Sequence, residues 1–128
     1  MMVNECSFRI AYYLYMPTAY IRFLNLIDAL DRINPGRSLD NIEIQMLEHI
    51  IQQQARNHKL LVGDMIAMSH LGSQATLHGR LKNLVAMGYI KLVEDKNDAR
   101  RKTVAPTKLA IKYVQFMSDC LEKSLKNL

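Results

Sequence analysis

The sequence predicts a mainly α-helical fold that carries one small β-hairpin, with its elements in the order α-α-α-α-β-β-α. Three observations support this fold class. Apolar residues recur at steps of three and four along most of the chain, which is the period of amphipathic helices. Capping residues, prolines and glycines divide that pattern into separate helices. The stretch 90–104 suggests two strands, and these flank a charged loop.

The first part of the chain predicts one clear helix. Residues 8–16 are apolar and aromatic, so helix and strand both stay open until Pro17 interrupts them. From Thr18 the pattern is helical, and the Asn-Pro-Gly turn at 34–36 ends it. Its apolar positions are Tyr20, Phe23, Leu24, Ile27, Leu30 and Ile33.

A second helix is expected to start near Asp40. Asp40 and Glu43 have the spacing of a capping box, in which each side chain bonds the backbone N–H of the other residue. The helix fades in the polar run 52–59. Its buried stripe is predicted at Ile42, Met46, Leu47 and Ile50.

Two further helices follow, joined by a short turn. The third is short and covers Val62 to Met68, with Met65 and Ile66 facing the core. After a turn at 70–72, Ser73 caps the fourth helix, which Gly88 ends. The fourth helix is predicted to bury Leu77, Leu81, Leu84 and Val85. Two helices joined in this way form a helix-turn-helix.

The remaining residues predict a hairpin and a last helix. Ile90, Leu92 and Val104 indicate two strands, and residues 94–101 join them in a charged loop. Thr107 then opens a C-terminal helix. Its apolar face comprises Leu109, Tyr113, Phe116, Met117, Cys120, Leu121 and Leu125.

Composition limits the classes of protein that fit. The chain has 128 residues, 49% of them hydrophobic, which suits a single domain spanning 1–128. No apolar run predicts a membrane span, and the N-terminus does not resemble a secretory signal. Free thiols at Cys6 and Cys120, in a reducing cytoplasm, are favoured over a disulfide.

Positive charge is concentrated in one part of the chain. The formal net charge is +5, and residues 58–112 alone hold ten basic and four acidic side chains. Lysine and arginine displace counterions from phosphates, so this part is expected to attract a polyanion. The alternative is a solvated surface that happens to be basic.

Polar side chains of the fourth helix have the chemistry to read a DNA groove. Glutamine pairs with adenine and arginine with guanine, and the charged loop would reach the neighbouring minor groove. We expect base contacts from Gln74, Thr76, His78 and Arg80, and phosphate or minor-groove contacts from Lys82, Lys96, Arg100 and Arg101. The predicted DNA-binding set also includes Ser73. The alternatives are an ordinary polar helix face and a solvated loop.

Catalytic and metal-binding signals are weak. The four histidines show no metal-ligand spacing, and neither cysteine lies nearby. No phosphate-binding loop, nucleophile elbow or carboxylate pair is evident. We therefore expect no enzyme activity, no metal and no cofactor.

At residues 39–110 the chain resembles the winged helix of the MarR family of bacterial transcription regulators. The family's loop pattern, Asp-x-Arg-Asp-x-Arg followed by a basic residue, is matched by Asp95, Asp98, Arg100 and Arg101, while Asn97 replaces the first arginine. Gly79 stands where the family often has arginine. Further matches are Gly88-Tyr89-Ile90 for Gly-Leu-Ile, Pro106-Thr107 for Leu-Thr, and Ala110 for the glycine that follows.

The resemblance implies a homodimeric transcriptional repressor that binds double-stranded DNA. It implies a winged helix-turn-helix core at 39–106, and terminal helices at 8–33 and 107–126 that dimerise. Two copies would place their fourth helices in successive major grooves of a pseudo-palindrome. The rival hypothesis is a winged-helix module that binds protein instead of DNA. A small-molecule effector that changes the spacing of the two helices stays open.

Overall fold

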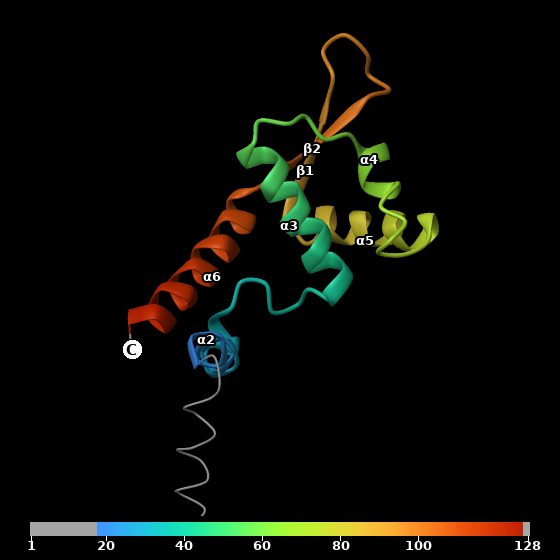
Figure 1. Ribbon diagram of the computed structural model, residues 1–128. Coiled ribbons are helices and arrows are strands. Elements are labelled where there is room, and N and C mark those ends of the chain that lie inside the picture. The colour runs from blue at the N-terminus through green and yellow to red at the C-terminus, as the bar shows by residue number, and fades with distance from the viewer. Residues whose placement is uncertain (1–17, 127–128) are drawn as a thin grey trace, which may run out of the picture. The chain divides into compact units, whose positions relative to one another are not determined.

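The computed structural model describes residues 18–126 of the chain (Figure 1). The predictions for residues 8–17 and for Cys6 lie outside the described residues. Within that range the predicted fold class is confirmed, since helices predominate and one antiparallel hairpin follows the fourth of them. The elements are α2 (Thr18–Ala29), the short 3-10 helix η1 (Asp31–Ile33), α3 (Asn41–Ala55), α4 (Val62–Ile66), α5 (Gln74–Ala86), β1 (Ile90–Glu94), β2 (Lys102–Pro106) and α6 (Lys108–Lys126).

The predicted capping box starts α3. The Asp40 side chain accepts a hydrogen bond from the Glu43 backbone N–H at 2.8 Å, and the Glu43 carboxylate accepts one from the Asp40 N–H at 2.9 Å. Glu43 is itself buried, so its side chain anchors the N-terminus of α3 in the protein interior. Burial of Met46, Leu47 and Ile50 confirms most of the predicted stripe, and Ile42 is half-buried.

Helix α4 is shorter than predicted, because it ends at Ile66 and not at Met68. After Ile66 the chain changes to tighter turns. The Met68 N–H bonds the Met65 carbonyl at 3.4 Å, and the Ser69 N–H bonds the Ala67 carbonyl at 2.8 Å. Such turns use the last carbonyls of the helix in place of a further helical turn. Met65 is buried as expected.

The predicted start and end of α5 are confirmed. Ser73 accepts the Thr76 N–H at 3.2 Å as N-cap, and Gly88 has a left-handed φ of 88° just past the helix. Leu77, Leu81 and Leu84 are buried, but the predicted burial of Val85 is wrong, since 38% of it is exposed. Val85 lies one residue beyond the buried stripe, so a rotation of about 100° carries it off the core side.

A third segment of the chain pairs with the outer edge of strand β2, which was not predicted. Strands β1 and β2 pair antiparallel with Leu92 opposite Val104. On the other side of β2, the Val104 N–H donates to the Leu60 carbonyl at 2.8 Å, and Leu61 forms a bridge with Thr103. The segment before α4 therefore holds the root of the hairpin. We call β1, β2 and the loop 95–101 the wing.

Residues 35–114 form one compact unit, which we call the winged unit. In Figure 1 α5 lies across α3, and the wing extends beyond the helices of this unit. Its core joins α3, α5 and the wing to the first turns of α6. The buried apolar residues are Leu39, Met46, Leu47, Ile50, Leu60, Met65, Leu77, Leu81, Leu84, Tyr89, Ile90, Val104, Ala110 and Tyr113.

Tyr89 joins three segments of the winged unit. Its hydroxyl donates to the Pro35 carbonyl, its carbonyl accepts the Thr107 N–H at 3.0 Å, and its own N–H donates to the Leu84 carbonyl at 3.0 Å. The Thr107 hydroxyl also bonds the carbonyls of Gly88 and Tyr89. The last turn of α5 is thus bonded to the beginning of the unit and to the start of α6.

A second compact unit combines residues 18–34 with 115–126. The predicted first helix is present, although its α-helical part ends at Ala29 and η1 continues to Ile33. No side chain of α2 is buried, and Tyr20, Leu24 and Ile33 are exposed. The Arg22 guanidinium donates to the Ser124 carbonyl at 3.0 Å. On α6, Cys120 and Ser124 are buried whereas Leu121 and Leu125 are exposed.

Candidate nucleic-acid interface

The outward face of α5 carries mostly small side chains and few long ones. With Leu77, Leu81 and Leu84 in the core, the helical period places Ala75, Gly79, Lys82, Asn83 and Ala86 on the opposite face, and all five are exposed. A Cβ at Gly79 would meet no atom within 4 Å. Three of the five side chains are a hydrogen atom or a methyl group, so the backbone of α5 is accessible along this face.

The expected base-reading residues lie on the two flanks of that face. Gln74 and His78 are exposed, and His78 shares a groove with Arg100 and Arg101 of the wing. On the other flank Thr76 and Arg80 are half-buried. The Thr76 hydroxyl accepts a bond from the Ser73 hydroxyl at 3.0 Å, so both hydroxyls belong to the helix cap.

Arg80 has an acidic partner at the start of the neighbouring helix α3. Its Nε lies 2.8 Å from Oδ2 of Asp40, the N-cap residue of α3. The two atoms are at ion-pair distance, although the N–H is not aligned for a hydrogen bond. Of the basic side chains predicted to contact DNA, Arg80 is therefore the one held against another helix.

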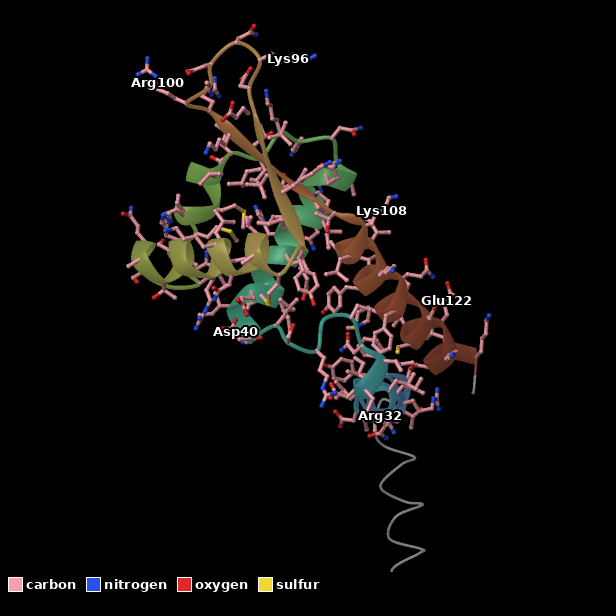
Figure 2. The ribbon with its side chains drawn as sticks, turned by 180° about the vertical axis from the view of Figure 1, so that it is seen from behind. Arg32, Asp40, Lys96, Arg100, Lys108 and Glu122 are labelled. Atoms are coloured by element: carbon pink, nitrogen blue, oxygen red, sulfur yellow. The ribbon has the colours of Figure 1, made fainter. Side chains whose placement is uncertain are left out.

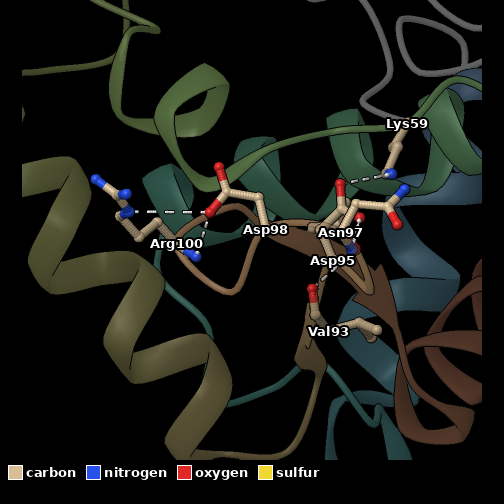
Figure 3. A network of polar contacts seen from close by, with 7 residues as sticks. Lys59, Val93, Asp95, Asn97, Asp98 and Arg100 are labelled. Atoms are coloured by element: carbon tan, nitrogen blue, oxygen red, sulfur yellow. Dashed lines mark hydrogen bonds and ion pairs between the residues drawn. The ribbon is translucent and has the colours of Figure 1, made fainter.

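The wing loop is shaped by its two aspartates (Figure 3). Asp95 accepts the Asn97 N–H at 3.0 Å, and Asp98 accepts the Arg100 N–H at 3.0 Å. The Arg101 N–H bonds the Asp98 carbonyl at 3.0 Å, and the Asp95 N–H bonds the Arg101 carbonyl at 2.9 Å. These side chain to backbone bonds are the Asx-turn geometry in which aspartate fixes a loop.

Asp95 also fastens the wing to the segment before α4. Lys59 Nζ lies 3.5 Å from Asp95 Oδ2. The Asn97 hydrogen bond, assisted by Lys59, holds the pKa of the Asp95 carboxyl below its usual value despite partial burial. Asp95 is therefore charged at every pH at which nucleic-acid binding is ordinarily measured.

The predicted basic residues of the wing are exposed, but they do not all lie on one side. Arg100 is 97% exposed, and its contact with Asp98 is loose at 4.0 Å. In Figure 2, Arg100 points to the side toward which α5 extends, whereas Lys96 points to the opposite side of the loop. Arg100 therefore lies on the same side of the wing as α5, and Lys96 lies on the other side.

A groove lies between helix α4 and the wing, and α5 borders it at His78. It measures about 510 Å³, and a smaller hollow of about 270 Å³ adjoins it, sharing Val62, His78 and Leu92. One rim is basic, and the floor is apolar. The remaining lining residues are Leu61, Gly63, Asp64, Ile66, Arg100, Arg101 and Lys102 in the first, and Leu81, Lys82, Val85 and Ala86 in the second.

Four residues that shape this surface were not in the predicted set. Asn83 and Lys102 are exposed beside predicted residues. The sequence already places Asn83 on the polar side of the fourth helix, but it was assigned no contact. Asp40 and Lys59 act through partners 40 and 36 positions away. No local sequence pattern marks such long-range ion pairs.

Residues 18–126 hold little that fits another type of site. Among these residues no three histidine, cysteine or acidic side chains cluster as metal ligands would. None of the helices in this range is long and apolar enough to cross a bilayer.

Comparison with known proteins gives structural but not sequence matches. The sequence matches no protein-family model and no curated protein. A crystal structure of an S. aureus MepR–DNA complex superposes with a TM-score of 0.62 at 20% identity, over 84% of this chain and 86% of that chain. Apo (heme-free) PefR gives 0.57 at 18% identity, over 91% and 93%. The heme sensor protein PefR in complex with heme and carbon monoxide gives 0.58 at 22% identity, over 82% and 72%.

MepR and PefR are MarR-family winged-helix transcriptional regulators. At these identities the similarity establishes the fold, so the chain has the winged helix-turn-helix fold of these proteins. The resemblance predicted from residues 39–110 is confirmed at this level.

Proposed function

We propose that this protein is a transcriptional regulator that binds double-stranded DNA sequence-specifically, as a homodimeric repressor. Helix α5 enters the major groove and the wing reaches the adjacent minor groove. One observation carries the proposal: exposed Arg100 of the wing lies on the side of α5, and both border one basic-rimmed groove. Fold similarity to a MepR–DNA complex supports it.

The small side chains on the outward face of α5 would allow the helix to approach base edges closely. Small side chains at Ala75, Gly79 and Ala86 leave room for the flanking Gln74 and His78 to reach the groove floor. Lys82 and Asn83 add one cation and one amide on the same face. Arg100, Arg101 and Lys82 are assigned to phosphates or to the minor groove. Lys96 is assigned to a phosphate on the other side of the wing tip.

Selection from a library of random duplexes tests this function directly. The purified protein should enrich fragments with two-fold symmetry, whose half-sites lie about one helical turn apart. Affinity for the enriched duplex should exceed affinity for a scrambled duplex at near-physiological salt. Absence of binding to any duplex at low salt would overturn the proposal, because the electrostatic term is then at its strongest.

The exposed apolar floor of the groove favours a second candidate function. Val85 and Leu92 are each 38% exposed, and they meet Val62 in the smaller hollow. Exposed apolar patches often mark protein contacts. As a protein-interaction module, the chain would lose its partner on Val85→Glu and bind random duplexes no better than an unrelated protein of equal charge. The selection experiment separates the two functions.

A further inference from the structure

The structure gives Arg80 a role different from that of its neighbours on α5. We propose that Arg80 is a positioning residue, held by Asp40, which fixes the orientation of α5 and does not read a base. The inference rests on the proposed function. It extends that function by separating the side chains of α5 that determine sequence preference from the one that holds the helix in place.

The first support is the fixed position of Asp40. One carboxylate oxygen accepts the Glu43 N–H at 2.8 Å and the other lies 2.8 Å from Arg80 Nε. The Asp40 N–H is in turn bonded to buried Glu43. With both oxygens engaged, Asp40 has little rotational freedom, so Arg80 is paired with a rigid group.

The second support is the location of the pair between two packed helices. Asp40 precedes the first turn of α3, and α3 contacts α5 through the buried leucines. Rotation of α5 about its axis would separate the two charges of the ion pair, which lie 2.8 Å apart at the edge of this contact, so their attraction opposes the rotation. Such rotation would move Gln74 and His78 relative to a groove.

The third support is what pairing removes from Arg80. Reading guanine requires a guanidinium that extends freely to the base edge. Here the Nε atom is buried and Arg80 is only half-exposed, on the flank nearest α3. Asp40 also offsets its charge, so Arg80 contributes little to the displacement of counterions from DNA.

A double-mutant cycle on DNA binding tests the proposal. The four proteins are the wild type, Arg80→Gln, Asp40→Asn and the double variant. Asparagine caps helices as well as aspartate does, so Asp40→Asn removes the charge and keeps the start of α3. The probe is the duplex that the wild type selects from a random library, with its single-base-pair variants.

We expect each single substitution to lower affinity by up to about fivefold, and the double variant to lose no more than either. The ranking of the base-pair variants should stay unchanged in all four proteins. Arg80→Lys, which keeps a cation for Asp40, should recover most of the affinity. These results would distinguish a positioning residue from a passive surface residue.

Two results would overturn the proposal. One is a loss of discrimination at a single base pair of about tenfold or more in Arg80→Gln, as expected of a base contact. The other is additivity of the two substitutions. Glu48→Gln controls for charge, because it removes an exposed acid of α3 from the same unit, and Glu48 does not line the groove. It should not reduce binding.

Failure of the proposed function has a different signature. In that case the wild type selects no duplex, and no variant changes binding. A second cycle, in urea unfolding, then reports whether Arg80 and Asp40 are coupled in the folded protein. Coupling without DNA binding would refute the regulator function, and with it the positioning role in DNA reading, while leaving the ion pair intact.

Discussion

Gly79 and Gly88 lie within and just after the same helix, yet the structure assigns them opposite roles. Gly79 is in the helix interior, where a Cβ would meet nothing within 4 Å. Gly88 has a φ of 88°, which other residues adopt only with strain. A Cβ at Gly88 would also meet nothing within 4 Å, so its conformation alone distinguishes the two.

Alanine substitution at the two glycines should therefore change stability in opposite directions. Gly79→Ala should raise the free energy of unfolding by up to about 1 kcal/mol, because alanine restricts the unfolded chain and favours the helix. Gly88→Ala should lower it by about 1–2 kcal/mol, because of the left-handed backbone. Urea denaturation measures both. Equal signs for the two variants would contradict this assignment.

Tyr113 should make stability fall at alkaline pH. Burial of its ring raises the pKa of the Tyr113 phenol above the usual value. Above about pH 10 the unfolded chain then releases this proton more readily than the folded chain, so stability decreases as the pH rises through the folded-state pKa. The urea midpoint of the wild type should drop more than that of Tyr113→Phe between about pH 9 and pH 11.

Tyr20 provides the matched control for this titration. It is 64% exposed, so Tyr20→Phe should follow the wild-type pH profile. An identical alkaline drop in Tyr113→Phe would mean that other groups cause it.

Single residues with local partners were the most predictable part of the chain. Ser73, Gly88 and the Asp40–Glu43 box were identified because caps act within one turn of their own helix. Val85 was misjudged, since it lies one residue beyond the stripe that Leu77, Leu81 and Leu84 bury. Arg80 was predicted as a free groove contact because its contact with Asp40, forty positions away, requires the folded geometry. Thr76 was predicted to contact a base, although the partner of its hydroxyl, Ser73, lies within the same helix cap.

At the level of elements, the wing is a separate contributor to the proposed DNA binding. Replacing Arg100 and Arg101 together with alanine should weaken binding to specific and random duplexes alike. If both contact phosphates in each copy of the proposed dimer, four contacts are lost and the slope of log K against log salt should become shallower by about 3.6. A titration of binding against salt concentration measures this slope, and an unchanged slope would remove the wing arginines from the interface.

A control for net charge comes from the first turns of α6. Lys108 and Lys112 are exposed there, and their double replacement by alanine removes the same charge away from the wing. It should leave the salt slope close to that of the wild type. Because the wing is held at its root by Leu60 and Lys59, neither double variant should alter the hairpin itself.

The strands of the hairpin were predictable from the sequence, whereas its contact with a distant segment was not. Its two strands and charged loop were found from residues 90–104, because their signals are contiguous in sequence. The pairing of Leu60 and Leu61 with β2 was not predicted, since the hydrogen bond between Leu60 and Val104 joins residues more than forty positions apart. The end of α4 at Ile66 was also missed, because its helical pattern continues into tight turns.

For the whole molecule, the exposed apolar face of α6 should determine the assembly state. Leu121 and Leu125 are 51% and 52% exposed in a single chain, a pattern that fits the proposed homodimer. Replacing both with glutamine should shift the protein toward monomer in sedimentation velocity. Affinity for the selected palindrome should fall more than affinity for one half-site.

Glu122 lies between these two leucines in sequence and is exposed on the same helix. Glu122→Gln introduces the same side chain without removing apolar surface, and it should leave the sedimentation profile unchanged. If the leucine variant remained a dimer, this face of α6 would have no part in assembly.

At this scale the sequence identified the fold class and the location of positive charge, because both depend on composition and periodicity averaged over many residues. Which side of the wing carries each cation could not be predicted. Lys96 and Arg100 differ in direction through the Asx turns at Asp95 and Asp98, and those turns set the path of the loop.

The three bonds of Tyr89 have a mechanical implication. The chain enters the winged unit at Pro35 and approaches its exit through Thr107, and both are bonded to this one residue at the foot of α5. A backbone displacement at Pro35 or at Thr107 would therefore reach Tyr89, whose N–H is bonded to Leu84 in the last turn of α5.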